Sequence, residues 1–348
     1  IGSGLVGSEM CIRDRYNKNI KVNMRKKVLL LLYFVAYYLG IILFFYWINR
    51  RKQRILVFHH IIPDDYVNTS FEQKIVCTSR SRFEWMMAIV NKRLKVTTEL
   101  GEPESAVITF DDGYRAALIA DEVLAKSANK AYFFIPIVNV DSFMPLWIDQ
   151  IMAWFAYVPE GEYRIVNRKV RIGDTLSRQQ EFSSLINTLY EKYDKVSILG
   201  MLEDIYPFRD LPIDKAYFAL RFKGLTSEEI LELKRKGHKI GGHSVRHDIL
   251  SMLDEWELRE DFKECSEYME RLFNTNLYAY PFGHRRDVTP GVMKECSQSV
   301  FTLAVMNEYN SEASDFSLSR MNISHYNSRF EIEASLSGFT QWLKNVLR

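Results

Sequence analysis

The sequence predicts an α/β fold in which parallel strands surround a common core. Two observations support this prediction. Apolar runs typical of strands alternate with helical segments along most of the chain, an order that favours a parallel sheet. Several predicted strands also end in residues that carry chemistry, among them Asp111 and His243. Barrel enzymes place their active sites at the carboxyl ends of parallel strands, so the two observations agree.

The predicted elements follow one another in a regular order. Apolar alternation and helical periodicity predict strands and helices on both sides of a long middle segment, residues 141–222, that breaks the rhythm. Before it lie a strand at 55–61, a helix at 82–93, a strand at 106–110, a helix at 114–126 and a strand at 131–137. After it lie a helix at 226–236, a strand at 238–240, a helix at 254–273, a strand at 277–280, a strand at 300–305 and a last helix from 331.

The middle segment carries its own signals. An aromatic-rich helix is predicted at 147–155, a hairpin around Asn167-Arg168, and mainly helical structure at 177–205. We read residues 141–222 as an insertion packed on the barrel. It either shapes the substrate cleft or covers an edge of the sheet.

Composition narrows the class of protein. The 348 residues are 47% hydrophobic and 26% charged, with a net charge of +2, which is typical of a globular protein. Nothing in this balance favours nucleic acid, and we expect no such partner. The cysteines lack Cys-x-x-Cys spacing, so we expect neither a disulfide framework nor a cysteine metal site. They are Cys11, Cys77, Cys265 and Cys296.

The first residues differ in character from the rest. Val6 to Arg15 resemble a translated sequencing adapter, and Met24 is a plausible start. We therefore treat residues 1–23 as an artefactual or disordered leader and residues 24–53 as a membrane anchor.

The anchor prediction depends on one apolar run. Val28–Ile48 contains 21 residues without a charge, and at ~1.5 Å per residue a helix of that length spans ~31 Å, enough to cross a bilayer. A cleaved signal peptide usually has a shorter apolar region and a small-residue exit, which this run lacks. We expect a single N-terminal transmembrane helix. Basic residues flank it on both sides, so charge does not orient it.

Two adjacent acids end the strand at 106–110. Burying Asp111 beside Asp112 is costly, because like charges repel and both lose water. A cation bound to one carboxylate would relieve this cost and leave the other free as a base. The alternative is an ordinary Asp-Gly turn.

Two histidines follow another strand about 130 residues later. His243 and His247 are spaced i, i+4, so on one helical turn both rings would face the same ion. The preceding Gly241-Gly242 suits a backbone that turns sharply at a strand end. His238, before the same strand, is expected to be exposed. With one of the two acids the pair would complete the three ligands of a catalytic metal site.

These motifs together resemble the polysaccharide deacetylase family, also called the NodB-homology or carbohydrate esterase 4 family. The resemblance rests on Thr-Phe-Asp-Asp-Gly, on His-Ser-x-x-His and on Tyr280-Pro281-Phe282-Gly283, and it covers about residues 54–325. It implies a distorted (β/α)7 barrel. We assign residues 54–140 and 223–348 to that barrel.

The resemblance also implies a reaction and roles for residues. The reaction is hydrolysis of N-acetyl groups on amino sugars of a polysaccharide, with a divalent metal, most typically zinc. The metal ligands would be Asp112, His243 and His247, and the catalytic base would be Asp111. We predict as substrate-binding residues Tyr280, Pro281, Phe282 and Arg320.

Two positions depart from the family pattern. Ala279 stands where many members have an arginine that orients the base, and Arg320 from a later strand is the candidate replacement. For the general acid the resemblance favours His325, with His284 as runner-up. His59 ends the first strand and is expected to be structural.

The Tyr-Pro-aromatic-Gly sequence looks like the branch that acts on β-1,6-linked N-acetylglucosamine polymers. We therefore expect an acetylated polysaccharide as partner and a catalytic domain outside the cytoplasm. Two alternatives stay open. One is an O-acetyl esterase or a peptidoglycan deacetylase on the same site. The other is a non-catalytic glycan-binding relative in an export complex.

Overall fold

The computed structural model describes residues 26–66, 70–166, 168–310 and 314–346. Contacts divide the chain into two compact units, which are described separately. One comprises Ile1–Arg51 with Tyr326–Arg348, and the other Lys52–His325. The predicted leader, residues 1–23, lies outside the described residues.

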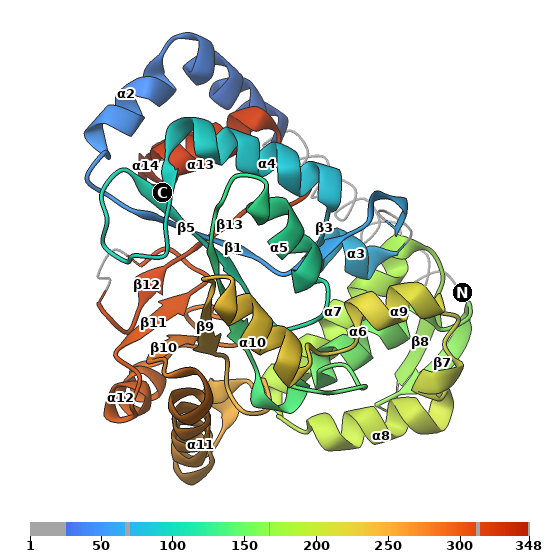
Figure 1. Cartoon of the computed structure of the whole chain (residues 1–348). Coiled ribbons are helices and arrows are strands. Elements are labelled where there is room, and N and C mark those ends of the chain that lie inside the picture. Colours follow the sequence, from blue (N-terminus) through green and yellow to red (C-terminus); the bar gives the residue numbers. More distant parts are fainter. Residues whose placement is uncertain (1–25, 67–69, 167, 311–313, 347–348) are drawn as a thin grey trace, which may run out of the picture. The chain divides into compact units, whose positions relative to one another are not determined.

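The larger unit is built on a parallel sheet that nearly closes into a barrel (Figure 1). The strands on its path are, in spatial order, β12 (Leu318–Ser319), β11 (Leu303–Met306), β10 (Leu277–Ala279), β9 (Lys239–Gly242), β6 (Ala131–Ile135), β5 (Ser105–Phe110), β1 (Arg54–Phe58) and β13 (Met321–Asn322). The two ends of the path, β12 and β13, are separated in sequence by Arg320 alone. One interrupted strand therefore pairs with β11 on one side and with β1 on the other, as the predicted barrel requires.

Three further strand pairings lie beside this path. β4 (Lys95–Val96) extends β5, and β2 (His60–Ile62) pairs in parallel with β3 (Cys77–Ser79). The predicted hairpin of the insertion is also present, as antiparallel β7 (Gly161–Ile165) and β8 (Arg168–Ile172).

Helices lie outside the strands (Figure 1). They are α3 (Phe71–Val76), α4 (Arg80–Arg93), α5 (Ala117–Ala125), α10 (Ser227–Arg235), α11 (Glu255–Phe273) and α12 (Pro290–Gln298). Aromatic side chains fill the space between α4 and the sheet: Phe83 lies 5.0 Å from Phe58 and 5.6 Å from Phe110, measured between ring centroids. Thr226 and Glu229 form the capping box that the sequence predicts at the start of α10.

The opposite face of the strands carries a second apolar cluster, which includes Ile55, Val107, Phe134 and Val305. Successive side chains of a strand alternate between faces, so on β5 the residues Val107 and Thr109 share a face with Asp111. The strand pattern thus directs Asp111 towards the same side as this cluster.

The glycine pair of β9 is needed for packing. A Cβ atom on Gly241 would lie 2.5 Å from the ring of Phe134, and one on Gly242 would lie 2.8 Å from Phe301. Both residues belong to the strand, and neither has a positive φ. The expectation that these glycines make a sharp turn is therefore wrong. Glycine is needed here because neighbouring side chains leave no room for a Cβ atom.

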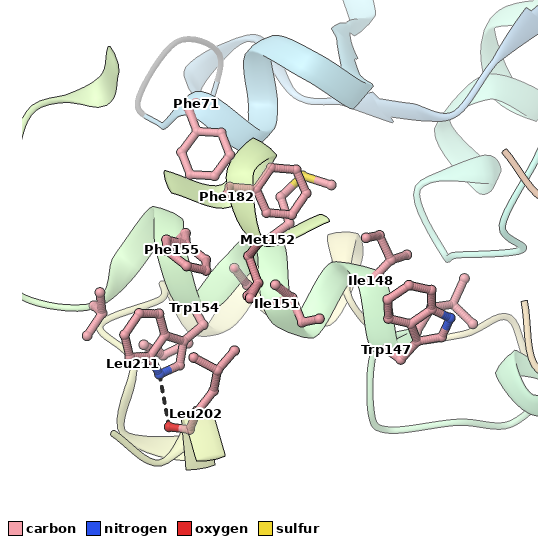
Figure 2. Close-up of a cluster of buried hydrophobic side chains, with 14 of the residues drawn as sticks. Phe71, Trp147, Ile148, Ile151, Met152, Trp154, Phe155, Phe182, Leu202 and Leu211 are labelled. Atoms are coloured by element: carbon pink, nitrogen blue, oxygen red, sulfur yellow. Dashed lines mark hydrogen bonds between the residues drawn. The ribbon is translucent and has the colours of Figure 1, made fainter. Parts of the chain in front are cut away.

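The insertion shares a hydrophobic core with neighbouring segments of the larger unit (Figure 2). Its helices are α6 (Trp147–Tyr157), α7 (Thr175–Glu191), α8 (Lys195–Ile205) and α9 (Lys215–Arg221). Trp154, Phe155 and Phe182 pack there with Phe71 of α3. The Trp154 indole N–H donates to the carbonyl oxygen of Leu202 at 3.1 Å, which ties α6 to α8.

The predicted anchor is not one continuous helix. A helix over Lys26–Tyr38 and α2 (Ile41–Ile48) are bent by 79° at a break, where Gly40 has a φ of 76°. Among the described residues, no single helix is long and apolar enough to cross a membrane. The two helices of the bent pair meet the requirement together, and they do so by length and composition alone. The predicted single transmembrane helix is therefore not shown. Gly40 allows the break, because glycine adopts a left-handed backbone without steric cost.

The last two helices belong to the same unit as this bent pair. The sequence-based prediction places residues 223–348 in the barrel. They are α13 (Arg329–Ser337) and α14 (Phe339–Val346). Tyr33 and Ile42 pack with Phe339 and Leu343 in a small buried cluster.

Candidate metal centre

Two acidic residues follow β5 at the carboxyl edge of the barrel. Asp111 and Asp112 are both buried. The backbone is left-handed at Asp112, with a φ of 73°, and at Gly113, with a φ of 66°. Asn139 supports this turn, because its Nδ2 donates to the carbonyl oxygen of Asp112 at 2.6 Å. The two carboxylates consequently meet different partners.

Asp111 is paired with Arg320, the residue that interrupts the strand between β12 and β13. Arg320 Nη1 donates to Oδ1 at 2.7 Å and Nη2 to Oδ2 at 2.6 Å. Burial alone would raise the pKa of Asp111, but the charge of Arg320, nearby His243 and these hydrogen bonds hold that pKa below its usual value. Asp111 is therefore an oriented carboxylate, and Arg320 occupies the place that the sequence suggested for it.

His243 and His247 lie in a loop after β9, not on a helix. The expectation of one helical turn is wrong: Ser244 has a φ of 70° and His247 a φ of 56°. Asp261 of α11 stabilises the loop, since its Oδ2 accepts hydrogen bonds from Ser244 Oγ at 2.9 Å and from the Val245 N–H at 3.0 Å. The loop still brings the two imidazoles together, with ring centroids 4.9 Å apart.

Three ligand-type side chains converge here. The ligand atoms of Asp112, His243 and His247 all lie within 4.8 Å of one another. From Asp112 Oδ1, the Nε2 atom of His247 is 3.3 Å away and that of His243 is 3.6 Å away. In a tetrahedral site with bonds of about 2.0–2.1 Å, neighbouring ligand atoms are roughly 3.3–3.4 Å apart. The two distances from Asp112 are thus close to those expected between ligands of one divalent ion.

The tautomer of His243 agrees with this fit. Its Nδ1 lies 2.7 Å from the carbonyl oxygen of Ala279, which can only accept, so Nδ1 carries the hydrogen. The Nε2 lone pair is then free to bind a metal, in the arrangement common to metal-binding histidines. Burial would raise the pKa of Asp112, but its contacts with three histidines hold that pKa well below the usual value. A metal-binding carboxylate must be ionised, and the lowered pKa of Asp112 favours that state.

Two histidines that follow β1 also approach the aspartates. The charge of half-buried His59 helps to lower the pKa of both Asp111 and Asp112. His60 is fully buried, and its Nε2 is 3.4 Å from Asp112 Oδ2. From the sequence we predict a structural role for His59 and no role for His60. The available signal was a pair of histidines directly after a strand whose carboxyl end faces the site.

The two predicted general-acid candidates have other partners. His325 Nδ1 accepts a hydrogen bond from the Ser79 N–H at 3.3 Å, and burial with the charge of Arg82 lowers its pKa. His284 is exposed, and its backbone N–H donates to Asp287 Oδ2 at 3.0 Å. His59 follows β1 beside Asp111, because Phe58 and Phe110 are partners in the parallel strands β1 and β5.

Aromatic side chains form a wall beside His247. The Phe282 ring lies 5.1 Å from the His247 ring and 6.1 Å from Trp147, between centroids. Trp147 Nε1 donates to the carbonyl oxygen of His247 at 2.8 Å. Since Trp147 begins α6, the insertion reaches the site, which favours the cleft-shaping role over simple coverage of an edge.

The other predicted substrate-binding residues are less accessible. Tyr280 is fully buried and its hydroxyl donates to the carbonyl oxygen of Phe316 at 2.9 Å. Pro281 is also buried, whereas Phe282 is half-buried with a φ of 59°. Tyr280 and Pro281 thus support the loop that presents Phe282.

His238 corrects another expectation. It is buried, its Nε2 pairs with Asp121 at 3.0 Å, and its Nδ1 accepts a hydrogen bond from the Ala131 N–H. It lies before β9, away from the carboxyl ends of the strands. Its role is structural, because a buried imidazole with two satisfied nitrogens bridges neighbouring elements.

Comparisons with known proteins agree with the geometry. Residues 205–301, which include both metal-site histidines, match the family described as polysaccharide deacetylase. The resemblance to the polysaccharide deacetylases is confirmed. The matched range does not extend to Asp111 and Asp112. The structure nevertheless places these two residues beside the histidines. The comparison with curated proteins finds no match.

Solved deacetylase structures share the fold. A polysaccharide deacetylase from Bacillus cereus is 18% identical, with a TM-score of 0.51, and the match covers 82% of this chain and 69% of that one. The deacetylase PplD of Streptococcus pyogenes, solved in complex with acetate, is 16% identical, with a TM-score of 0.50 and coverage of 82% and 96%. At these identities the likeness concerns the fold.

Proposed function

We propose that this protein is a metal-dependent hydrolase that removes N-acetyl groups from amino sugars of a polysaccharide. One observation carries the proposal: the oriented carboxylate of Asp111 lies next to a buried Asp112–His243–His247 ligand set. A base and an electrophile side by side are what hydrolysis of an unreactive amide requires.

Each residue has a distinct task in this proposal. Asp111 accepts the proton of the attacking water, and Arg320 keeps the carboxylate ionised and fixes its direction. Asp112, His243 and His247 hold the divalent ion, which would polarise the acetyl carbonyl and lower the pKa of bound water to roughly 7. Asp111 therefore needs no protonation change before the reaction.

The leaving amine needs a proton, and His59 is the group we assign to supply it. It is half-buried, and it follows β1 at the place where Asp111 follows the adjacent parallel strand β5. His325, the candidate from the sequence, faces Ser79 instead. In the proposed mechanism the general acid is therefore His59 and not His325.

We propose a polymer of N-acetylglucosamine, such as a β-1,6-linked exopolysaccharide, as substrate. The Tyr280–Gly283 motif supports this choice, and the half-buried Phe282 gives a sugar ring an apolar surface next to the ligands. The pairing of Asp111 with Arg320 argues against a non-catalytic relative, because a binding protein has no use for an oriented base.

The decisive experiment measures acetate release. The metal-loaded protein is incubated with β-1,6- and β-1,4-linked N-acetylglucosamine oligomers, peptidoglycan and an O-acetylated glycan. Release from the β-1,6 oligomers is the expected result. Activity on esters alone would indicate an O-acetyl esterase, and activity on peptidoglycan alone a peptidoglycan deacetylase. No release from any substrate, with metal bound, would contradict an enzymatic role. The Asp111→Asn protein is the matched control.

We further propose that the bent helix pair associates with a membrane and that the catalytic unit lies outside the cytoplasm. Many large apolar side chains of the pair are exposed, including Leu31, Phe44 and Trp47. The side follows from the proposed substrate, since charge does not orient the segment. A reporter after Arg348 tests it: alkaline phosphatase should be active there. A cytoplasmic reporter that is active instead would contradict the proposed side.

A further inference from the structure

His60 is a buried histidine with no assigned role. It begins β2 and is only 1% exposed. Neither ring nitrogen makes a hydrogen bond within normal limits in the described part of the chain. A buried polar side chain without partners is costly, so its position calls for an explanation.

His60 faces one particular oxygen of Asp112. His60 Nε2 lies 3.4 Å from Oδ2, whereas Nε2 of His243 and Nε2 of His247 face Oδ1. The two carboxylate oxygens are therefore divided between two kinds of neighbour. Oδ1 faces the ligand set, and Oδ2 faces His60.

The His60 ring lies among buried side chains. One of these neighbours is Tyr114, whose ring centroid is 5.3 Å from the guanidinium carbon of Arg221. Arg221 is itself buried and pairs with Asp149 at 2.7 Å. The Tyr114 ring lies 5.1 Å from the His60 ring, between centroids, and closes another side.

A neutral imidazole has one N–H donor and one acceptor nitrogen. The nitrogen that faces a carboxylate must be the donor, because a lone pair there would be repelled. Nε2 therefore carries a hydrogen. This is opposite to His243, whose hydrogen is on Nδ1.

We propose that His60 is a positioning residue: its Nε2–H holds Oδ2 of Asp112, so that Oδ1 stays directed at the metal. The inference rests on the proposed metal site and deepens it. Outer partners of this kind orient metal-binding carboxylates, and their loss typically lowers metal affinity 10–100-fold. His60 does not touch the substrate or the metal in this assignment.

The first test measures metal affinity in the full-length protein by competition for Zn²⁺ with a chromogenic chelator. His60→Leu removes the donor and keeps an apolar side chain of similar size. His60→Gln retains an N–H near the position of Nε2. We expect a 10–100-fold weaker affinity for the leucine variant and recovery to within about 5-fold of the parent for the glutamine variant.

The matched control is His238→Leu. His238 is another buried histidine paired with a carboxylate, at 3.0 Å, but it lies before β9. This variant should lower the melting temperature and leave the zinc affinity unchanged. If His60→Leu kept the parent affinity, or if both leucine variants weakened it equally, the positioning role would be wrong.

A second test does not depend on any variant. Long-range proton–nitrogen NMR of ring-labelled parent protein reports which nitrogen of each imidazole carries hydrogen. At neutral pH we expect hydrogen on Nε2 of His60, and hydrogen on Nδ1 would overturn the inference.

These outcomes are separate from those of the glycan assay. Parent protein that binds zinc but releases no acetate contradicts the proposed function and leaves the positioning role standing. If the parent protein releases acetate but His60→Leu binds zinc as tightly as the parent, the positioning role is wrong and the proposed function stands. Parent protein that binds no divalent metal would contradict both.

Discussion

Arg320 donates a hydrogen bond to each carboxylate oxygen of Asp111, and neither side chain is accessible to solvent. The pair joins the end of β5 to the strand that closes the barrel. Buried ion pairs add little net stability, because both groups lose water. The arrangement instead gives Asp111 a fixed direction and charge, which is what a general base needs.

Arg320→Met should shift the acid limb of the pH–activity profile. Burial raises the pKa of Asp111 and the charge of Arg320 lowers it, so without Arg320 the pKa rises. Activity, which needs the carboxylate, should then be lost at a higher pH as the solution is acidified. We also expect kcat to fall by about 100-fold from misorientation. The profile of kcat/KM against pH measures the shift, and an unchanged acid limb would contradict it.

Asp111→Asn should abolish turnover and leave the metal in place. Asparagine keeps the shape of the side chain but does not accept the proton of water. Asp112→Asn should instead weaken metal binding, because Asp112 is the carboxylate that faces both imidazoles. Metal content after dialysis and acetate release separate the two variants. If Asp111→Asn lost the metal and Asp112→Asn kept it, the roles assigned to the two acids would have to be exchanged.

His59→Gln should reduce kcat on N-acetyl substrates by roughly 10²–10⁴-fold, the usual contribution of a general acid. The matched control is His325→Gln, because His325 contacts Ser79 instead of the aspartate pair. An ester substrate, whose leaving group needs less protonation than an amine, should be affected less by His59→Gln. If His325→Gln carried the larger loss, the acid predicted from the sequence would be the correct one.

Asp261→Asn should remove a pH dependence of stability. Burial is the main effect that raises the pKa of Asp261 from 3.8 to about 6. The folded state then binds this proton more tightly than the unfolded state, so the associated stability is present below about pH 4 and is lost as pH rises through about 6.

The size of this effect follows from the pKa shift. The stability of the parent relative to Asp261→Asn should fall by up to about 3 kcal/mol between pH 4 and 7. Urea unfolding at several pH values, with a chelator present, measures the difference. A difference that does not change with pH would contradict the raised pKa.

Much of the site could be predicted because its chemistry lies in short continuous motifs. Asp111-Asp112 and the His243–His247 pair each follow a recognisable strand, and parallel strands bring their carboxyl ends to one edge. Arg320 could be proposed only as the base's partner, since one arginine in a weak strand pattern is a poor signal. Its position became evident once β12 and β13 were seen to close the sheet.

Other features depend on contacts that sequence spacing does not encode. An i, i+4 histidine pair suits a helix, yet Asp261 stabilises a loop with two left-handed residues at that place. The parts played by Trp147 and His60 come from side chains that meet across distant segments. The break at Gly40 was hidden because hydropathy alone does not register a left-handed glycine.

The division of one strand at Arg320 has a consequence for synthesis of the protein. Asp111 and Arg320 are 209 residues apart in the chain. At about 5–20 residues per second, a ribosome adds the arginine roughly 10–40 s after the aspartate. Until then the sheet lacks its last strand and the base lacks its partner. A nascent or truncated chain that ends before residue 318 should therefore lack the hydrolytic activity proposed above, because the closing strand and the partner of Asp111 are both missing.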